Sequence, residues 1–459
     1  MNAYKILKGS TCVLAFVLLA WQQEIFAQDS SSNKIEEFIK KSKDPISWLS
    51  WGADLRVRDE YLNNVIALNE SAPKSEQNWI RIRTRLWSSI KPLTNFAFNT
   101  RLTWEGREWT REPYKRGVGS GFDWQDGIFD IFNIKYSEAF GLPLTAIIGR
   151  QDMMIGDGWL VGDGTPLDGS RTYFFDAARL TYNLKEQNTT IDAIYIDQSG
   201  HNDRWLPPIN RLNNYLIEQS EKGVIFYLSN KSIKEANIDA YFMYKHMDAV
   251  LANGDNGNLY TMGSRVAGVL YDHWSYRVEG AYQTGRKNKA DVDAYGVNTC
   301  FAYLFKDTYS NQLRFTFEHL SGDDPNTPDN EQFDQLWGRW TQWSEVYKYN
   351  SMIIKESRPC EISNFNRFGP GWSFKPHKKL DFIADYFAVF ADESRDPGLP
   401  NSSLFGTGTF RGHLVETQLK FKVSEHLDGH LLGEYFFPGD FYAYHDSMIF
   451  LRAQLNFTY

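Results

Sequence analysis

Along residues 79–87, which read W-I-R-I-R-T-R-L-W, three arginines alternate with Ile80, Ile82, Thr84 and Leu86. Successive side chains of a β-strand point to opposite faces. The pattern therefore predicts a strand with one apolar face and one cationic face, the latter formed by Arg81, Arg83 and Arg85. Two settings suit such a strand: a soluble sheet with its arginines in water, or a membrane barrel with its arginines in a wet lumen.

The same two-residue period recurs along the chain in segments of roughly ten residues, as in membrane-barrel strands. Examples are residues 51–58, 96–105, 276–283, 314–318, 381–390 and 415–421. Short connections such as 91–95, 139–143, 271–273 and 376–379 alternate with long polar ones such as 106–127, 152–172, 198–220 and 321–350. Short periplasmic turns and longer outside loops are typical of outer-membrane barrels. We therefore predict an all-β protein, a single transmembrane antiparallel barrel of about 18 strands with both termini on the periplasmic side.

The two ends of the chain favour the membrane setting. Lys5 and Lys8 precede an apolar run at residues 12–21, which predicts a signal peptide over residues 1–28, with a buried N-terminal helix as the alternative. Residues 29–50 are predicted to be a periplasmic segment with a short helix, or a disordered lead-in, before a barrel domain at 51–459. Residues 447–459 alternate and end in Tyr459. This ending resembles the signal that hands outer-membrane barrels to their assembly machinery, although a soluble sandwich could also close on such a strand.

Composition agrees with strands. Aromatic residues make up 16% of the chain, and strands favour them. Beyond residue 21 no apolar run is long enough for a spanning helix, so a membrane crossing would use strands. The net charge of -8 does not discriminate, because loops and turns carry much of it. Cys300 and Cys360 could pair in an oxidising periplasm, but their spacing fixes no distance and two thiols are the expectation.

Membrane energetics predict which way the arginines face. An arginine on the lipid face at mid-bilayer costs roughly 2–4 kcal/mol. A one-residue slip at residues 80–86 would expose three arginines to lipid, at a cost on the order of 6–12 kcal/mol. The arginines are therefore expected to face the lumen.

Several motifs, in this order and spacing, resemble the alginate export family of outer-membrane barrels. They are R-I-R-T-R-L at 81–86, I-G-R-Q at 148–151, F-D-A at 175–177, T-M-G-S-R at 261–265, V-E-G-A-Y-Q-T-G at 278–285, S-G-D-D-P-N at 321–326, G-W-S-F-K-P at 371–376 and F-F-P-G-D at 436–440. The resemblance implies a single barrel in the outer membrane of a Gram-negative-type bacterium. The best-known member exports an anionic polysaccharide through an electropositive pore, so the resemblance also implies transport.

Charged residues on the predicted lumen face are the candidate substrate path. They are Arg58, Arg81, Arg83, Arg85, Arg101, Arg150, Arg265, Arg277, Glu279, Glu416 and Arg452. Guanidinium groups bind carboxylates with forked hydrogen bonds, and a polyuronate carries one carboxylate per sugar. Rings of such charges set anion selectivity in pores. Arg81, Arg83 and Arg85, the arginine ladder, lie on one strand. The strands of Arg58 and Arg101 are its expected neighbours, so these five arginines are expected to form one cationic patch. The alternative is that lumen acids, such as Glu60 and Glu105, neutralise the arginines and only stiffen the wall.

Other candidate chemistry is weaker. Asp323 and Asp324 lie in an oxygen-rich loop that could bind Ca²⁺, but the EF-hand spacing is absent, so a plain turn and no metal are predicted. No nucleophile elbow, catalytic triad or nucleotide-binding loop stands out, which predicts neither an enzyme nor a cofactor. Trp337, Trp340 and Trp343 could stack on sugar rings at the pore mouth, but packing within their loop is favoured.

The sequence thus predicts a monomeric outer-membrane channel for anionic polysaccharide or oligosaccharide, with an arginine-lined lumen. A general or carbohydrate-uptake porin of broader selectivity is the first alternative, and a barrel acting as an adhesin or structural anchor is the second. The expected partners are outer-membrane lipid, the anionic saccharide and the barrel assembly machinery, with no nucleic acid.

Overall fold

The computed structural model describes most of the chain. The described residues are 42–43, 46–73, 75–110, 122–163, 174–201, 204–210, 215–338, 341, 343–354, 362–395 and 398–459. The expected signal peptide, most of the N-terminal segment with its helix, and Cys360 lie outside these residues.

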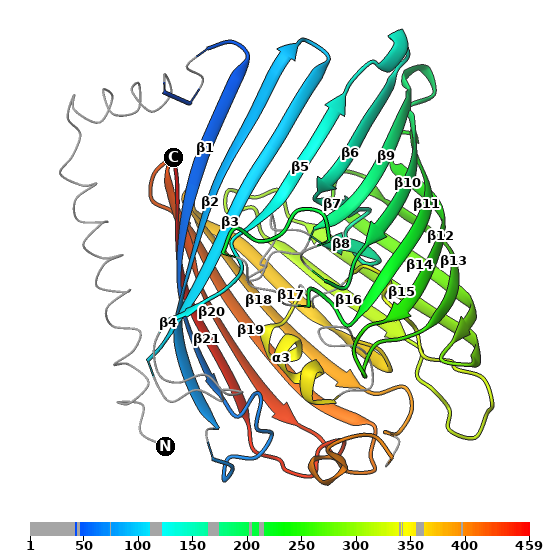
Figure 1. Ribbon diagram of the computed structural model, residues 1–459. Helices are drawn as coiled ribbons and strands as arrows, with labels where there is room; N and C mark the ends of the chain where they lie inside the picture. The colour runs from blue at the N-terminus through cyan, green and yellow to red at the C-terminus, as the bar shows by residue number, and fades with distance from the viewer. Residues whose placement is uncertain are drawn as a thin grey trace, which may run out of the picture.

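Within the described residues, eighteen antiparallel strands follow one another around a closed barrel (Figure 1). The last strand pairs with the first, from Asp54↔Thr458 to Asn63↔Ile449, which closes the ring. The strands are β1 (Leu49–Asn63), β2 (Glu76–Leu93), β3 (Phe96–Trp109), β5 (Ile128–Tyr136), β6 (Leu144–Gln151), β9 (Phe175–Leu184), β10 (Thr189–Gln198), β11 (Gln219–Ile233), β12 (Ala236–Ala249), β13 (Gly257–Leu270), β14 (Trp274–Lys287), β15 (Ala290–Leu304), β16 (Gln312–Leu320), β17 (Phe365–His377), β18 (Leu380–Phe390), β19 (Phe410–Lys422), β20 (Leu427–Pro438) and β21 (Met448–Thr458). The all-β closed barrel of about 18 strands is therefore confirmed.

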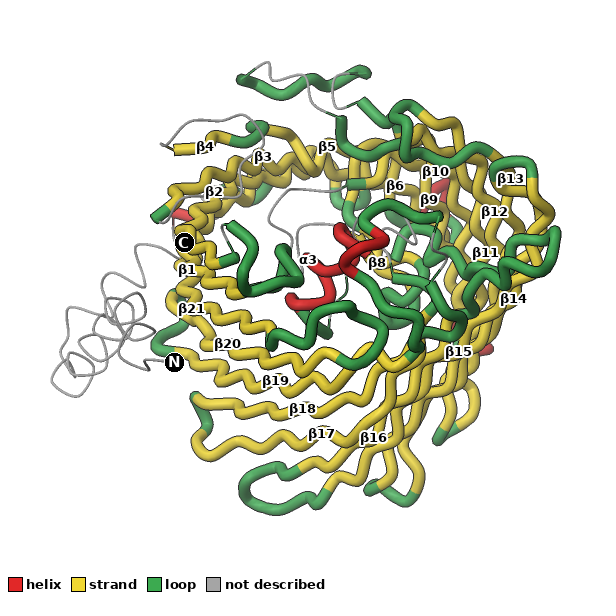
Figure 2. The backbone as a smooth tube through the Cα atoms, turned by 90° about the horizontal axis from the view of Figure 1, so that it is seen from below, coloured by secondary structure: helices red, strands yellow, loops and turns green. Residues whose placement is uncertain are grey.

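A few elements lie outside this ring of strands. The short strand β4 (Phe122–Trp124) extends the sheet at the loop end of β3. Strands β7 (Met153–Ile155) and β8 (Val161–Asp163) form a separate hairpin. The helix α3 (Glu345–Ile354) lies inside the ring of strands when the barrel is viewed end-on (Figure 2). The 3₁₀ turns are η1 (Ala139–Gly141), η2 (Lys185–Gln187) and η3 (Ser402–Leu404). Among the described helices, none has the length and apolar character needed to cross a membrane.

The two ends of the barrel differ in the length of their connections. At one end the strands are joined by tight turns, such as residues 94–95, 234–235 and 271–273. The final residue also lies at this end, where the Tyr459 N–H donates to the Ala53 carbonyl at 2.8 Å. The opposite end carries the long connections, including residues 321–364 between β16 and β17. The predicted alternation has one exception, because Asn288 and Lys289 alone join β14 to β15 at the long-loop end.

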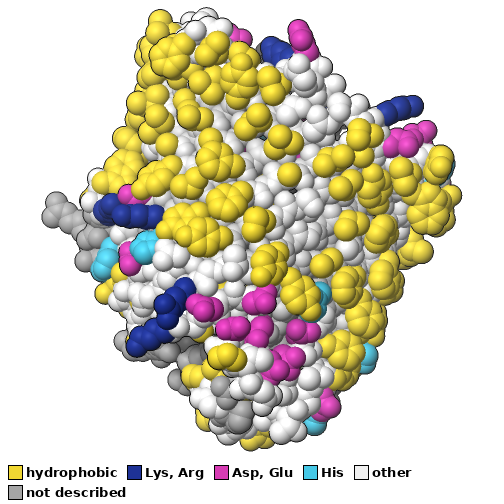
Figure 3. All heavy atoms as spheres, turned by 90° about the vertical axis from the view of Figure 1, so that its right-hand side faces the viewer, with side chains coloured by type: hydrophobic (Ala, Val, Ile, Leu, Met, Phe, Trp, Pro, Cys, Tyr) yellow, Lys and Arg dark blue, Asp and Glu magenta, His cyan; other side chains and the backbone are white. Residues whose placement is uncertain are grey.

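The outer face of the barrel is apolar. Along most strands, residues on one parity are buried inside while the other parity exposes large apolar side chains, such as Leu86, Phe226 and Val278. Figure 3 shows hydrophobic side chains spread over one side of the wall, with Asp and Glu gathered toward its lower end. This is the face expected to meet lipid.

A charged side chain on this outer face should destabilise the barrel at the middle of a strand and have little effect on stability in a turn. Phe226 is 53% exposed in the middle of β11, whereas Tyr271 is 80% exposed in a turn. We expect Phe226→Arg to lower the free energy of unfolding in lipid vesicles by about 2–4 kcal/mol, and Tyr271→Arg to change it by about 0–1 kcal/mol. Urea titration of the refolded barrels measures both values. Equal effects of the two substitutions would contradict this placement of the bilayer.

An apolar core fills part of the barrel interior. At the long-loop end, inward residues of the wall such as Leu62, Trp79 and Phe450 are buried against residues of two inward-folded connections. One connection holds the β7–β8 hairpin and contributes Trp159, Leu160 and Val161; the other, residues 321–364, contributes Phe333, Leu336, Trp337, Val346 and Tyr347. Burial of this apolar surface stabilises the inward position of both connections. The lumen is therefore narrowed from within.

Candidate functional site

Six arginines from three adjacent strands converge on the inner face of the barrel. We call them the arginine cluster: Arg56, Arg58, Arg81, Arg83, Arg85 and Arg452. The register of β1 and β2 places Arg56 directly opposite Arg83 and Arg58 directly opposite Arg81. Like charges directly opposite each other in a sheet are destabilising, so the cluster requires nearby carboxylates.

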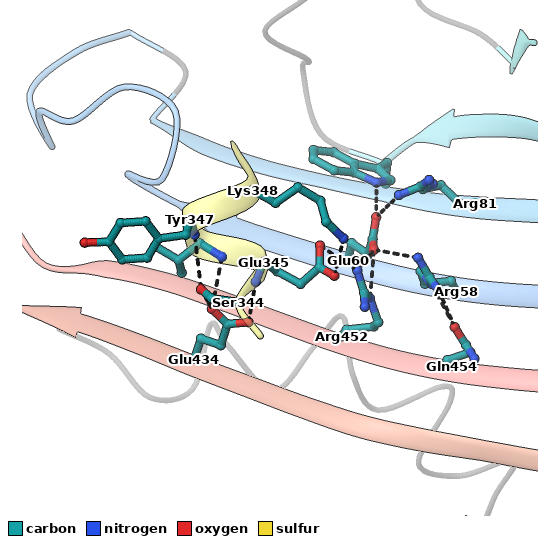
Figure 4. A network of polar contacts seen from close by, with 12 residues as sticks. Arg58, Glu60, Arg81, Ser344, Glu345, Tyr347, Lys348, Glu434, Arg452 and Gln454 are labelled. Atoms are coloured by element: carbon teal, nitrogen blue, oxygen red, sulfur yellow. Dashed lines mark hydrogen bonds and ion pairs between the residues drawn. The ribbon is translucent and has the colours of Figure 1, made fainter. Parts of the chain in front are cut away.

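Glu60 is the central carboxylate of the cluster (Figure 4). It is fully buried and pairs with Arg452 at 2.6 Å and Arg81 at 2.9 Å, with Arg58 farther away at 3.5 Å. The Trp79 indole N–H also donates to it at 2.7 Å. Charge-assisted bonds of this length are the strong kind, so Glu60 ties β1, β2 and β21 together at the closing seam of the barrel.

Two further carboxylates neutralise part of the remaining charge. Asp54 accepts a hydrogen bond from Arg85 Nε at 2.6 Å and lies 3.8 Å from Arg83. Glu105 of β3 contacts Arg81 at 3.1 Å and Arg56 at 3.3 Å. On the inner face of the fully described strands β1, β2 and β21, six arginines thus meet two acids, with Glu105 as a third from β3. The wall keeps a positive excess here.

A cavity of about 440 Å³ opens beside the arginine cluster. One side is cationic and the adjoining side is acidic. The lining residues are Arg56, Arg58, Arg83, Arg85, Arg452, Gln454 and Asn456 on β1, β2 and β21, Glu416, Gln418, Lys420, Asp428, His430, Leu432 and Glu434 on β19 and β20, and Trp343, Ser344 and Glu345 at the start of α3. Residues of opposite charge therefore border one water-accessible space.

The first turn of α3 is fixed to the wall by Glu434. This buried carboxylate accepts hydrogen bonds from the backbone N–H groups of Glu345 and Val346 at 2.7 and 3.0 Å, and from the Ser344 hydroxyl at 2.6 Å (Figure 4). Ser344 caps the helix by accepting the Tyr347 N–H. A carboxylate at a helix N-terminus also interacts favourably with the helix dipole. Glu345 reaches back to Arg452 at 3.0 Å, so α3 joins the arginine cluster.

A second cavity of about 240 Å³ lies between the two inward-folded connections and strands β14–β17. Its lining includes Trp159, Arg277, Asn298, Glu318, Thr341, Trp343 and Arg367. Glu318 accepts from Arg367 at 2.8 Å and from the Trp159 indole at 3.0 Å. Trp343 lines both cavities, so the two spaces adjoin.

Asp157, at the tip of the β7–β8 connection, binds two arginines beside this cavity. It contacts Arg265 at 2.9 Å and Arg277 at 3.0 Å. Burial raises the pKa of Asp157, but the hydrogen bonds from Arg277 and Arg265 outweigh burial, so the pKa lies below its usual range. Asp157 is therefore ionised at neutral pH.

The candidate residues from the sequence fall into separate groups. Arg58, Arg81, Arg83, Arg85 and Arg452 lie together, and Glu416 borders the same cavity. Arg101 instead pairs with Asp130 and Asp152. Arg150 pairs with Asp176, and Arg265 and Arg277 share Asp157. Glu279 accepts from the Tyr241 hydroxyl.

Several important residues were missed by sequence reasoning. Arg56 has the parity of Arg58 and could have been included on that signal. Asp157, Ser344 and Glu345 carry no local signal, because their roles arise from the inward folding of long connections.

The weaker candidates have ordinary structural roles. Asp323 and Asp324 accept backbone N–H bonds within their own loop. Among the described residues, no group of three or more His, Cys, Asp or Glu side chains is arranged to hold a metal ion. Trp337 is 2% exposed and packs as a core residue, but against Gly223 and Lys245 of the wall as well as within its own loop. Trp343 is half-buried, and Trp340 lies outside the described residues.

Comparison with known proteins identifies the family. The profile of the family described as alginate export matches residues 47–449, most of the chain. The chain belongs to the alginate export family. As a member of the alginate export family, it is an outer-membrane β-barrel of a Gram-negative-type bacterium, with the family and fold of transport channels.

Solved structures share the fold at low sequence identity. OccAB2 of Acinetobacter baumannii is 13% identical with a TM-score of 0.58, over 89% of this chain and 98% of that chain. OpdL of Pseudomonas aeruginosa is 10% identical with a TM-score of 0.54, over 90% and 99%. OccK5 (OpdH) of Pseudomonas aeruginosa is 12% identical with a TM-score of 0.53, over 89% and 97%. No curated protein matches the chain.

Proposed function

We propose that this member of the alginate export family passes anionic polysaccharide or oligosaccharide through its lumen, and that the arginine cluster is part of the path. The proposal rests on one observation: the first cavity is bordered by Arg56, Arg58, Arg83 and Arg85. Guanidinium groups bind carboxylates with forked geometry, and charged rings select ions by sign. We propose transport without enzymatic chemistry.

Arginines that are partly neutralised by neighbouring protein groups suit transport better than arginines without any partner. Arg83 and Arg85 share Asp54, and Arg58 also binds Gln454 at 2.6 Å. A passing carboxylate then exchanges with an existing partner, so each contact is weak. Conduction requires binding that is strong enough for entry and weak enough for exit at several sites in series. The cluster offers such a series along β1 and β2.

A porin of broader selectivity is the second candidate, and the acids favour it. The register places Asp385, Glu416 and Glu434 side by side across β18, β19 and β20. Glu416 and Glu434 border the same cavity as the arginine cluster, whereas Asp385 pairs with Arg314 at 2.5 Å. The field of the two cavity acids would attract cations and oppose a polyanion. The two candidates therefore differ in the sign of the permeant ion.

Ion selectivity in planar bilayers separates the candidates. We expect the channel to prefer anions and Arg83→Ser/Arg85→Ser to reduce this preference several-fold, because both side chains border the cavity. Arg204→Ser/Arg286→Ser is the matched control, since these arginines lie on the surface, 48% and 67% exposed. Reversal potentials under a salt gradient measure the effect. A cation-selective channel would contradict the first candidate, and a sealed barrel would contradict both.

The partners follow from the barrel. We propose that the C-terminal strand β21 is the segment delivered to the barrel assembly machinery, because it is an alternating strand that completes the ring. We propose a monomeric channel, since one chain closes the barrel by itself.

A further inference from the structure

The tip of the β7–β8 hairpin carries one carboxylate, that of Asp157. Asp157 lies between Gly156 and Gly158, whose φ values are +59° and +79°. Glycine adopts this left-handed backbone without strain, so the tip can turn tightly on both sides of Asp157. A Cβ on Gly156 would lie 3.3 Å from the Tyr227 hydroxyl and 3.5 Å from Arg265 Cδ, so the tip sits close to the wall.

The wall opposite the tip presents two guanidinium groups. Arg277 of β14 is paired with Ala267 of β13, two residues from Arg265, so the two arginines are diagonal neighbours on one face. Arg265 binds the Asp157 carboxylate through Nη2 and Nε at 2.9 and 3.3 Å, and Arg277 binds it through Nη1 at 3.0 Å. Arg265 is anchored by Asp239 at 2.8 Å, and Arg277 donates to Asn298 at 3.0 Å. Two oriented guanidinium groups around one carboxylate form an anion-binding site.

The second cavity adjoins this site and is lined by aromatic, polar and charged side chains, including Asp157 and Arg277 themselves. Trp159, stacked on Phe333, and Trp343, with Arg367 over its ring, are the aromatic part of the lining. Asn298, Gln335 and Thr341 supply polar groups. Arg277 Nε and Thr341 Oγ1 are buried and have no hydrogen-bond partner among the described residues. Thr341 is 7% exposed, and buried hydroxyls are normally hydrogen-bonded, so this one is available to bind a ligand. The cavity, about 240 Å³, is smaller than the roughly 300–1,000 Å³ of drug-sized ligand pockets and suits a single sugar unit.

We propose that Arg265 and Arg277 form a carboxylate subsite for an acidic sugar unit, and that Asp157 occupies this subsite until the sugar's carboxylate replaces it. The inference rests on the proposed function, because it specifies where an acidic saccharide binds within the lumen. Asp157 thus acts as an internal competitor carried on the β7–β8 connection.

Charge conservation makes the exchange feasible. A substrate carboxylate that replaces Asp157 leaves the charge around Arg265 and Arg277 unchanged, so neither guanidinium loses its counter-ion. The Asp157 side chain is 37% exposed, so a competitor has access to the site. A tethered group competes at an effective concentration in the millimolar range for short linkers. A single acidic sugar is therefore a weak competitor, whereas an oligomer with several carboxylates competes better.

The test removes the internal carboxylate and measures saccharide binding. Current block in planar bilayers gives the affinity of the channel for trigalacturonate, galacturonate and maltotriose, and isothermal titration in detergent gives an independent value. We expect Asp157→Asn to bind trigalacturonate about tenfold more tightly than the unmodified channel, with galacturonate also strengthened and maltotriose unchanged. Asp157→Glu keeps the charge and should resemble the unmodified channel. Asp197→Asn is the matched control, because Asp197 pairs with Arg204 on the surface.

The outcomes separate this inference from the proposed function. Equal trigalacturonate affinity in Asp157→Asn and Asp157→Glu overturns the inference, as does an equal gain for maltotriose. An anion-selective channel with unchanged trigalacturonate affinity in Asp157→Asn keeps the proposed function and rejects the subsite. A channel without anion selectivity that still gains trigalacturonate affinity in Asp157→Asn rejects the proposed function and keeps the subsite.

Discussion

Replacing Glu60 by glutamine should lower the free energy of unfolding by about 3–5 kcal/mol. The side chain is fully buried, and its carboxylate contacts Arg81, Arg452 and Arg58. Glutamine keeps the volume but removes the charge, so these arginines lose a shared counter-ion inside the barrel. Urea unfolding in lipid vesicles, followed by the heat-modified mobility of the barrel on gels, measures the loss.

Two comparisons sharpen this test. Glu70→Gln alters an exposed glutamate in the connection after β1 and should change stability little. Arg452→Met in the Glu60→Gln background should restore part of the stability, because it removes one of the arginines left without Glu60. A loss below about 1 kcal/mol in Glu60→Gln would mean that the remaining acids satisfy the cluster and that Glu60 is dispensable.

Replacing Glu434 by alanine should increase single-channel conductance several-fold. The carboxylate accepts two backbone N–H groups and the Ser344 hydroxyl at the start of α3. Leaving a buried donor unsatisfied costs about 1–3 kcal/mol, so three such donors favour release of the helix from the wall. Release would widen the space between α3 and the arginine cluster. Conductance in planar bilayers and protease cleavage within residues 345–354 report the change.

Two further variants show whether a change in conductance comes from the loss of the Glu434 carboxylate. Glu425→Ala alters an exposed turn at the other end of the barrel and should conduct like the unmodified channel. Glu434→Gln retains an amide oxygen as acceptor and should give an intermediate conductance. Unchanged conductance in a folded Glu434→Ala barrel would show that α3 stays docked through its apolar contacts, such as Val346 and Tyr347.

The local alternation of side chains was sufficient to predict the strands that form the wall of the barrel. The alternation at Arg81, Arg83 and Arg85 predicted a strand with an inward cationic face, and the structure places these side chains on the inner face of β2. The strand count and the family followed from the same periodicity and from ordered motifs. The prediction worked because a two-residue period assigns each side chain to a face, and because lipid strongly penalises the reversed assignment.

Charge pairing was only partly predictable. Glu60 and Glu105 were recognised as inward-facing acids, but their partners depend on which strands become neighbours. Glu60 meets Arg452 only because β1 and β21 close the ring, across 392 residues of sequence. Arg101 was expected beside the ladder, yet it turns toward Asp130 and Asp152. Side-chain direction within a face depends on the partner strand, which a single-strand pattern does not specify.

The sequence by itself determined the fold class and, in the segments with clear alternation such as β2, which side chains face inward, because these depend on alternation and on the solvent outside. Only the tertiary structure decided how open the lumen is. The two connections that narrow it pack by contacts between distant segments, such as Glu434 with Ser344 and Asp157 with Arg265. Such contacts depend on where a long connection folds, and no local period encodes that position. The arginine ladder is thus a property of the sequence, whereas the two cavities beside it are properties of the folded chain.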